Sequence, residues 1–228
     1  MAVARTISLI GHSGTGKSTL ASGLLKASGL DSEVDFDPSP QEKERGYSID
    51  LGVGYCSIDG ETLNVLDTPG ASEFVEEVHK GVYMSDMSLL LVDSEKGVEV
   101  HTEKVWDIAD EKENPTMVLI NKMDKDEANF LEVLSSLREE LDGTFIPLEI
   151  PLVEDGEYIG IVDIPRGEAS YFDRSETEIP EEYSQVAGEE RENLLEELAE
   201  QDDELMMMYL EEEEIGAEQI NRDRKSVV

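Results

Sequence analysis

The run GHSGTGKS at residues 11–18 contains the residue types that bind phosphate groups, at the spacing G-x-x-x-x-G-K-S. Its glycines allow the backbone to curl so that successive N–H groups point into one concavity, and the helix expected to follow adds positive potential there. Lys17 would reach the β- and γ-phosphates of a nucleotide, and the Ser18 hydroxyl would ligate Mg²⁺. The motif therefore predicts a phosphate-binding loop over residues 11–18.

A second motif, DTPG at residues 67–70, follows a strand-like run at 61–66. An aspartate at this place can hold Mg²⁺ through water, so we expect Asp67 to lie on the metal side of the nucleotide. The backbone N–H of Gly70 would then face the γ-phosphate. Because D-x-x-G is also a common turn, this motif carries weight only together with the others.

A third motif, NKMD at residues 121–124, follows another strand-like run. Asp124 could accept hydrogen bonds from guanine N1–H and the exocyclic amine, a donor pair that adenine lacks. We expect this carboxylate to be buried and so to reject adenine, which disfavours an ATP-using enzyme. The stem of Lys122 can lie along the base, and Asn121 can tie this loop to the phosphate loop. The three motifs lie in order, each after a strand, where an open α/β sheet binds ligands. Together they predict a guanine-nucleotide site.

The pattern of strands and helices that must position these motifs indicates an α/β fold: a mostly parallel sheet with helices on both faces. An Asp59-Gly60 hairpin should join two of the strands. Residues 30–50 are polar and broken by prolines, and we expect a long mobile loop there. The predicted strands cover residues 5–11, 51–58, 61–66, 88–93 and 116–121, and the predicted helices cover 17–29, 72–84, 99–111 and 126–141.

The character of the chain changes near Asp142-Gly143. Residues 144–164 are rich in strand-forming residues and contain a second hairpin signal at Asp155-Gly156, and residues 181–220 form an acidic stretch with helical periodicity. We therefore expect a core domain over 1–142 and an acidic α+β subdomain over 143–228.

The net charge is −37, from 55 acidic and 18 basic residues, and both parts of the chain are acidic. This composition disfavours diffuse or sequence-specific binding to nucleic acid, which needs clustered Lys and Arg. A solvated acidic surface explains the charge, and adaptation to a high-salt cytoplasm is the alternative. No apolar run reaches the length of a membrane span. The single cysteine, Cys56, and the lack of a signal-like start predict a cytoplasmic protein.

Four longer stretches make the sequence similar to the GTP-binding domain of translation elongation factor G, and more narrowly to the elongation-factor-G-like paralogues. KERGYSI at 43–49 resembles the family's switch I, and LDTPGASEFVEEV at 66–78 resembles its switch II. Residues 121–152 are similar beyond the NKMD motif, and 143–220 resemble a subdomain inserted in that GTPase domain. The chain ends without a later Ser-Ala motif that contacts guanine in the family, so it resembles a fragment of a longer factor.

The resemblance implies GTP and GDP as ligands, Mg²⁺ as cofactor and the P-loop GTPase fold. It implies action on the ribosome in elongation and translocation, with the acidic subdomain meeting the stalk protein of the large subunit, although that segment could instead be merely solvated. It assigns nucleotide binding to Gly11, His12, Ser13, Gly14, Thr15, Gly16, Lys17, Ser18, Thr19, Asn121, Lys122 and Asp124, metal binding to Ser18, Ser48 and Asp67, and γ-phosphate sensing to Gly70.

One departure from the family bears on catalysis. Ala71 stands where the family has the histidine that positions the attacking water, and a methyl group can neither orient water nor stabilise charge. The sequence therefore leaves two hypotheses open. The chain is either a ribosome-stimulated GTPase, in which Lys17 supplies charge at the phosphates, or a GTP-binding, ribosome-associated module with little or no hydrolysis.

Overall fold

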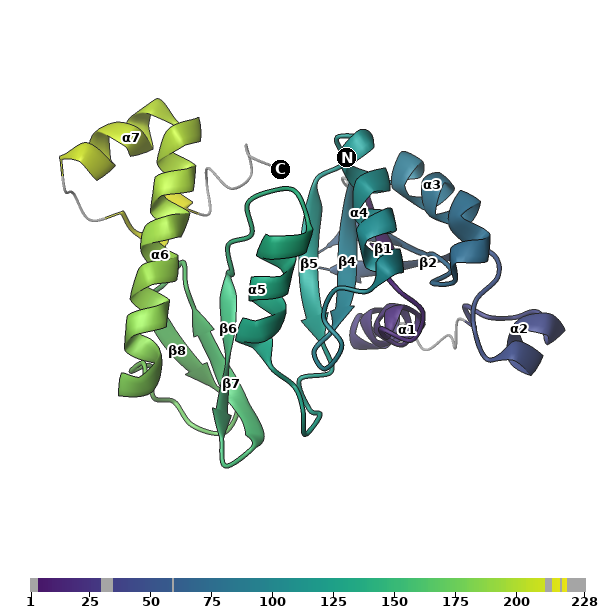
Figure 1. The fold of residues 1–228 in the computed structure, drawn as a ribbon, viewed down its shortest axis with the longest axis horizontal. Coiled ribbons are helices and arrows are strands. Elements are labelled where there is room, and N and C mark those ends of the chain that lie inside the picture. The colour runs from purple at the N-terminus through teal and green to yellow at the C-terminus, as the bar shows by residue number, and fades with distance from the viewer. Residues whose placement is uncertain (1–3, 30–34, 59, 212–214, 218, 221–228) are drawn as a thin grey trace. The chain divides into compact units, whose positions relative to one another are not determined.

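The computed structural model describes residues 4–29, 35–58, 60–211, 215–217 and 219–220 (Figure 1). The chain divides into two compact units, Met1–Leu141 and Asp142–Val228, which are described separately below. Asp59, the first residue of the predicted hairpin turn, lies outside the described residues. Among the helices described, none is long and apolar enough to cross a membrane.

The first unit is built on a five-stranded sheet in the order β2-β3-β1-β4-β5 (Figure 1). β1, β3, β4 and β5 are parallel neighbours, and β2 pairs antiparallel with β3. The predicted mostly parallel sheet is therefore confirmed. The strands are β1 (Ala4–Ile10), β2 (Gly52–Ile58), β3 (Glu61–Asp67), β4 (Met87–Asp93) and β5 (Thr116–Asn121).

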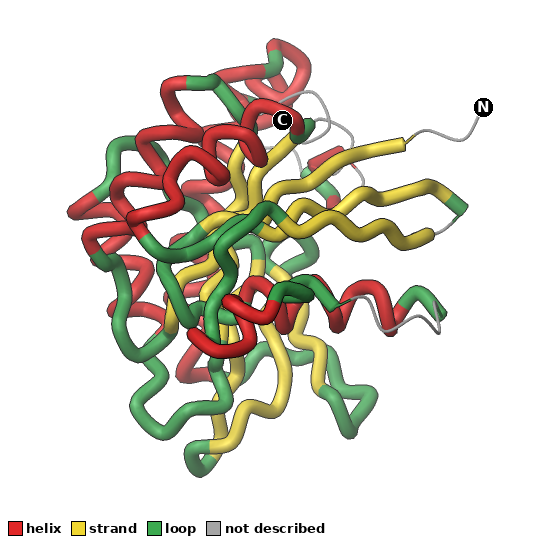
Figure 2. The backbone as a smooth tube through the Cα atoms, turned by 90° about the vertical axis from the view of Figure 1, so that its right-hand side faces the viewer, coloured by secondary structure: helices red, strands yellow, loops and turns green. Residues whose placement is uncertain are grey.

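Helices cover both faces of this sheet (Figure 2). Parallel strands need such crossover connections, which explains the alternation of strands and helices along the chain. The helices are α1 (Lys17–Ala27), α2 (Pro40–Arg45), α3 (Val75–Met84), α4 (Val100–Glu111) and α5 (Phe130–Glu140), with a short 3₁₀ helix, η1 (Ser72–Phe74).

An apolar core lies between α1 and the sheet, and Leu9 and Leu25 are almost fully buried in it. On the other face, α3 approaches β1 closely at a glycine. A Cβ on Gly81 would lie 2.6 Å from the Thr68 Cγ2 atom and 3.6 Å from the Ser8 Cβ atom. The core on the α1 side comprises Leu9, Ala21, Leu25, Phe36, Cys56, Val65 and Leu91.

The segment expected to be a mobile loop over 30–50 contains the short helix α2, so that part of the prediction is wrong. Ser39 caps this helix in a capping box with Glu42, and Pro40 occupies its first turn. Proline at this position costs no hydrogen bond, and a capping box satisfies two backbone N–H groups. The sequence SPQE therefore contained the signal for a helix that has no apolar periodicity.

Among its described residues, the second unit contains an antiparallel sheet in the order β6-β7-β8 and the helices α6 and α7. β8 was not predicted, and the expected acidic helix is divided in two at Asp202. The Asp202 carboxylate accepts hydrogen bonds from the N–H groups of Glu204 and Leu205 and so begins a new helix. The elements are β6 (Glu149–Glu154), β7 (Glu157–Asp163), β8 (Glu168–Tyr171), α6 (Glu181–Gln201) and α7 (Asp203–Leu210).

Candidate nucleotide-binding site

The predicted phosphate loop connects β1 to α1 at the carboxyl end of the sheet, and its glycines are required by the backbone. Gly11, Gly14 and Gly16 have φ values of 138°, 80° and 102°, which side chains rarely adopt. A Cβ on Gly11 would lie 2.4 Å from the carbonyl oxygen of Leu91, and one on Gly16 would lie 2.5 Å from the Nδ2 atom of Asn121. The loop is therefore closely packed against the ends of β4 and β5.

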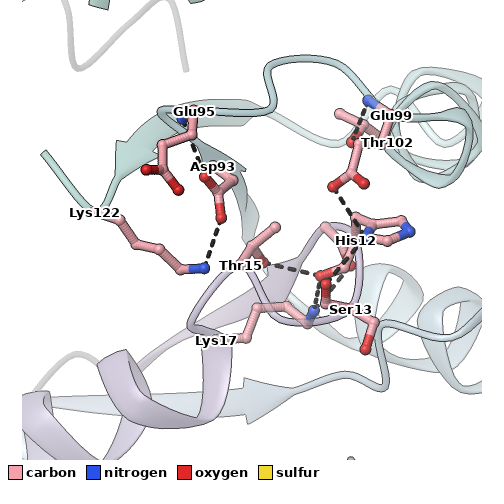
Figure 3. Close-up of polar contacts among 10 residues, drawn as sticks. His12, Ser13, Thr15, Lys17, Asp93, Glu95, Glu99, Thr102 and Lys122 are labelled. Atoms are coloured by element: carbon pink, nitrogen blue, oxygen red, sulfur yellow. Dashed lines mark hydrogen bonds and ion pairs between the residues drawn. The ribbon is translucent and has the colours of Figure 1, made fainter. Parts of the chain in front are cut away.

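Lys17 lies under this loop and is almost fully buried. Its Nζ atom donates hydrogen bonds to the carbonyl oxygens of Gly11 (2.8 Å) and His12 (2.9 Å) (Figure 3). Burial lowers the pKa of Lys17 to about 8, although the charge of Asp67 opposes this shift. A desolvated ammonium group held against loop carbonyls can interact strongly with a phosphate placed above the loop.

Asp67, at the end of β3, is 1% exposed, and in the described part of the chain neither of its carboxylate oxygens has a hydrogen-bond partner. Burial raises its pKa to about 6. The nearby Ser18 hydroxyl and Lys17 ammonium oppose this rise without forming a hydrogen bond of normal geometry to it. A buried carboxylate without partners is costly, so this position calls for a cation.

Two hydroxyl groups lie beside this carboxylate site. The Oγ atoms of Ser18 and Ser48 are 3.3 Å apart, and Ser48 is buried. The structure thus brings together the three residues assigned to the metal from sequence. Small divalent cations such as Mg²⁺ bind oxygen ligands of this kind, so the residues present fit that ion.

Gly70 packs directly on the phosphate loop. A Cβ at this position would lie 2.6 Å from the Lys17 Nζ atom and 2.7 Å from the Ser13 nitrogen. Thr68 fixes the same segment, because its hydroxyl donates to the carbonyl oxygen of Leu9 at 2.7 Å. Ala71 follows at the start of η1, where its carbonyl oxygen accepts from the N–H of Phe74. The chain therefore presents a methyl group one residue beyond this close contact.

The NKMD loop is joined to the phosphate loop through Asn121, the residue expected from the sequence to make this connection. The Nδ2 atom of Asn121 donates to the carbonyl oxygen of Thr15 at 2.8 Å. Lys122 has a φ of 66°, and its ammonium group pairs with Asp93 at 2.6 Å (Figure 3). Asp124 is exposed, which corrects the expectation that its carboxylate is buried.

Residues 3–220 match the family model described as the elongation factor Tu GTP binding domain. The chain belongs to this family. It is 36% identical over 224 residues to an elongation factor G-like protein of Thermotoga maritima, a match that covers 96% of this chain and 32% of that protein. It also matches a crystal structure of a Thermus thermophilus protein with a TM-score of 0.84 and 32% identity, over 96% of this chain and 34% of the other. The chain thus spans about a third of the length of these relatives.

Sequence reasoning missed a second buried carboxylate in this GTP-binding domain, that of Glu42 in α2. Its Oε1 atom accepts from the backbone N–H groups of Ile49 (3.0 Å) and Asp50 (3.2 Å), and its Oε2 atom accepts from the backbone N–H of Ser39 (3.0 Å). Burial alone would raise the pKa of Glu42, but these hydrogen bonds outweigh it and lower the pKa to about 2. Glu42 therefore fixes the segment that follows Ser48.

A histidine cluster beside the phosphate loop of the GTP-binding domain was also not predicted. The Nδ1 atom of His12 lies 3.0 Å from Glu99 Oε2 and 3.0 Å from the carbonyl oxygen of Ser13 (Figure 3). The ring of His101 lies 6.3 Å from that of His12, and both of its nitrogens lack a partner among the described residues. Burial lowers the pKa of His101 to about 4, so this ring is neutral near pH 7.

Proposed function

We propose that this domain binds GTP and GDP with Mg²⁺ and acts on the ribosome as part of an elongation-factor-G-like translation factor that hydrolyses GTP. The observation that carries the proposal is the buried Asp67 carboxylate without partners, next to Ser18 and Ser48 and behind Lys17. A site that leaves a carboxylate unpaired and places an ammonium group beside it suits a divalent cation bound to phosphates.

In this proposal each motif has a separate task. Residues 11–19 surround the phosphates, with Gly14 replacing a charged residue usual in the family. Lys17 balances the charge of the β- and γ-phosphates, and the N–H of Gly70 contacts the γ-phosphate. The Mg²⁺ ion would be held by Ser18, Ser48 and Asp67 and would supply charge neutralisation at the phosphates.

The guanine base would lie at the NKMD loop, where Asp124 accepts from its Watson–Crick edge and the stem of Lys122 lies along its face. The exposure of Asp124 is compatible with this role, because a base stacked on the loop would itself cover the carboxylate. The tie between Asn121 and Thr15 supports the proposal, since it fixes the distance between the base and the phosphates.

Residues 143–228 would work as the inserted acidic subdomain, and its proposed partner is the stalk protein of the large ribosomal subunit. The acidic helices α6 and α7 favour a basic protein surface over nucleic acid or an anionic membrane. A factor that acts on ribosomes works in the cytoplasm, which is the localisation we propose.

A second candidate function, GTP binding with little or no hydrolysis, rests on Ala71. The decisive experiment is single-turnover GTP hydrolysis by the full-length protein with ribosomes, comparing the wild type with Ala71→His. If the wild type lacks a water-positioning group, the histidine should raise the rate by roughly a hundredfold. If the wild type is already fast and the variant is no faster, the binding-only function is excluded.

A further inference from the structure

Asp93 is a buried carboxylate that none of the nucleotide motifs includes. It ends β4 and lies opposite Asn121, the last residue of β5, in the register of the two strands. Its side chain is 3% exposed, and its Oδ2 atom lies 2.6 Å from the Lys122 ammonium group. Its other oxygen, Oδ1, accepts from the N–H of Glu95 at 3.1 Å. Asp93 therefore has a fixed orientation, in which one oxygen holds the Lys122 ammonium group and the other accepts from the backbone.

The Asp93 carboxylate is ionised when it holds Lys122. Burial alone would raise its pKa, but the hydrogen bond from Lys122 and the one from the N–H of Glu95 outweigh burial and lower the pKa. The ion pair is short and buried on its Asp93 side, so removing Lys122 would leave a buried carboxylate without its cation. The contact is thus a strong constraint on where the lysine head can lie.

Lys122 is held at its other end as well. Its backbone has a φ of 66°, and its carbonyl oxygen accepts a hydrogen bond from the Ser94 hydroxyl at 2.8 Å. The N–H of Ser94 in turn donates to the carbonyl oxygen of Asn121 at 3.0 Å. With both ends fixed, the four-carbon stem of Lys122 cannot sample its usual rotamers, and the cost of ordering it is met before any ligand binds.

We propose that Asp93 is a positioning residue for the guanine base: it holds the stem of Lys122 as a preformed apolar surface against which the purine ring stacks. This inference rests on the proposed function and deepens it. Hydrogen bonds from the base edge to Asp124 discriminate guanine only when the ring lies in one plane, and the Asp93–Lys122 pair sets that plane.

The test compares Asp93→Asn with the wild type in two competition assays against a fluorescent GDP analogue, both with Mg²⁺. One competitor is GTP and the other is tripolyphosphate, which has no base. We expect Asp93→Asn to weaken GTP binding about tenfold and to leave tripolyphosphate binding unchanged. The matched control is Glu154→Gln, which removes the carboxylate of an exposed ion pair with Arg174 in the second unit and should change neither affinity.

A second variant keeps the test decisive if Asp93→Asn folds poorly. Lys122→Met keeps an apolar stem but removes the ammonium group, so its GTP affinity should fall by a similar factor. In the double variant the second substitution should add less than about twofold, because one interaction is removed in both cases.

The possible outcomes distinguish a failure of this inference from a failure of the proposed function. Wild type that binds no GTP overturns the proposed function and the inference together. Wild type that binds GTP, with an unchanged affinity in Asp93→Asn, overturns the inference alone. Equal weakening of GTP and tripolyphosphate would show that Asp93 acts on the phosphate loop and would also overturn it. Selective weakening of GTP supports the positioning role.

Discussion

Replacing Glu42 by Gln tests whether one buried carboxylate fixes the segment that carries Ser48. The glutamate accepts backbone hydrogen bonds on both of its oxygens, from Ser39 on one side and from Ile49 and Asp50 on the other. Glutamine has the same shape, but its amide nitrogen must face one of these donors. A donor then meets a donor, and a buried N–H group loses its partner.

The magnitude follows from the pKa of Glu42, which falls from 4.5 in the unfolded chain to about 2 in the folded protein. At about 1.4 kcal/mol per pH unit, the carboxylate contributes about 3 kcal/mol to stability near neutral pH. Glutamine keeps one acceptor oxygen, so we expect Glu42→Gln to lose about 2 kcal/mol. That loss corresponds to a fall in Tm of roughly 4–8 °C for a protein of this size.

The contribution of Glu42 to stability should decrease as the pH falls. Because the folded-state pKa is depressed, the stabilisation is present above pH 4.5 and is lost as the pH falls through about 2. The stability gap between the wild type and Glu42→Gln should therefore be full at pH 7 and less than half as large at pH 3. Urea unfolding at the two pH values measures this gap.

The control is Glu44→Gln, on the same helix but exposed, which should change stability by less than about 0.5 kcal/mol. Equal stability of the two variants at pH 7, or a gap for Glu42→Gln that does not narrow at pH 3, would refute the reasoning. A functional readout can be added, since Mg²⁺-dependent GTP binding should weaken in Glu42→Gln alone if Ser48 is a metal ligand.

Three further predictions concern the phosphate loop and its neighbours. Lys17→Ala should abolish binding of a fluorescent GTP analogue, because the ammonium group held under the loop is removed; an unchanged Kd would contradict the loop assignment. Gly16→Ala should cost more than about 1 kcal/mol in urea unfolding, since its φ is 102° and the new Cβ would meet Asn121, whereas Gly23→Ala, in open space on α1, should not destabilise. Because the depressed pKa of about 4 favours the neutral His101 ring in the folded state, the wild type should lose on the order of 2 kcal/mol of stability between pH 6.5 and 4. His101→Gln should reduce this loss, and identical pH profiles of stability for the two proteins would show that His101 does not cause it.

The parallel sheet and its order of motifs followed from the sequence because apolar runs such as SLLLVD and TMVLIN alternate with segments of helical periodicity. SLLLVD is largely buried in β4, whereas TMVLIN, in the edge strand β5, is mostly half-buried. The boundaries depended on caps that periodicity does not contain. The helix expected over 126–141 begins at Phe130 because the Asn129 side chain accepts from the Glu132 N–H. Likewise α2 exists because of its capping box and its proline, with no apolar face to reveal it.

Within the candidate site, the residues that belong to sequence motifs could be found from the sequence. The residues that hold those motif residues in place became visible only in the structure. The Asn121–Thr15 hydrogen bond could be expected from the motif. Asp93 and Glu42 could not, because their roles depend on which strand end or turn lies opposite them in space. A lone acidic residue after a strand or within a polar segment gives no sequence signal of its partner.

The register of the β2–β3 hairpin has a mechanical consequence. Gly52 pairs with Asp67, the aspartate proposed to face the metal, so the ladder ends beside the proposed metal site. Residues 49–51 separate this last pair from Ser48. An ion bound by both Ser48 and Asp67 would link the two segments just beyond the last residue pair of the β2–β3 ladder. If that ion left, the β2–β3 ladder would keep its pairs from Gly52 onward, and Glu42 would still hold the N–H groups of Ile49 and Asp50. Loss of the ion would therefore free Ser48 without requiring any pair of the β2–β3 ladder to break.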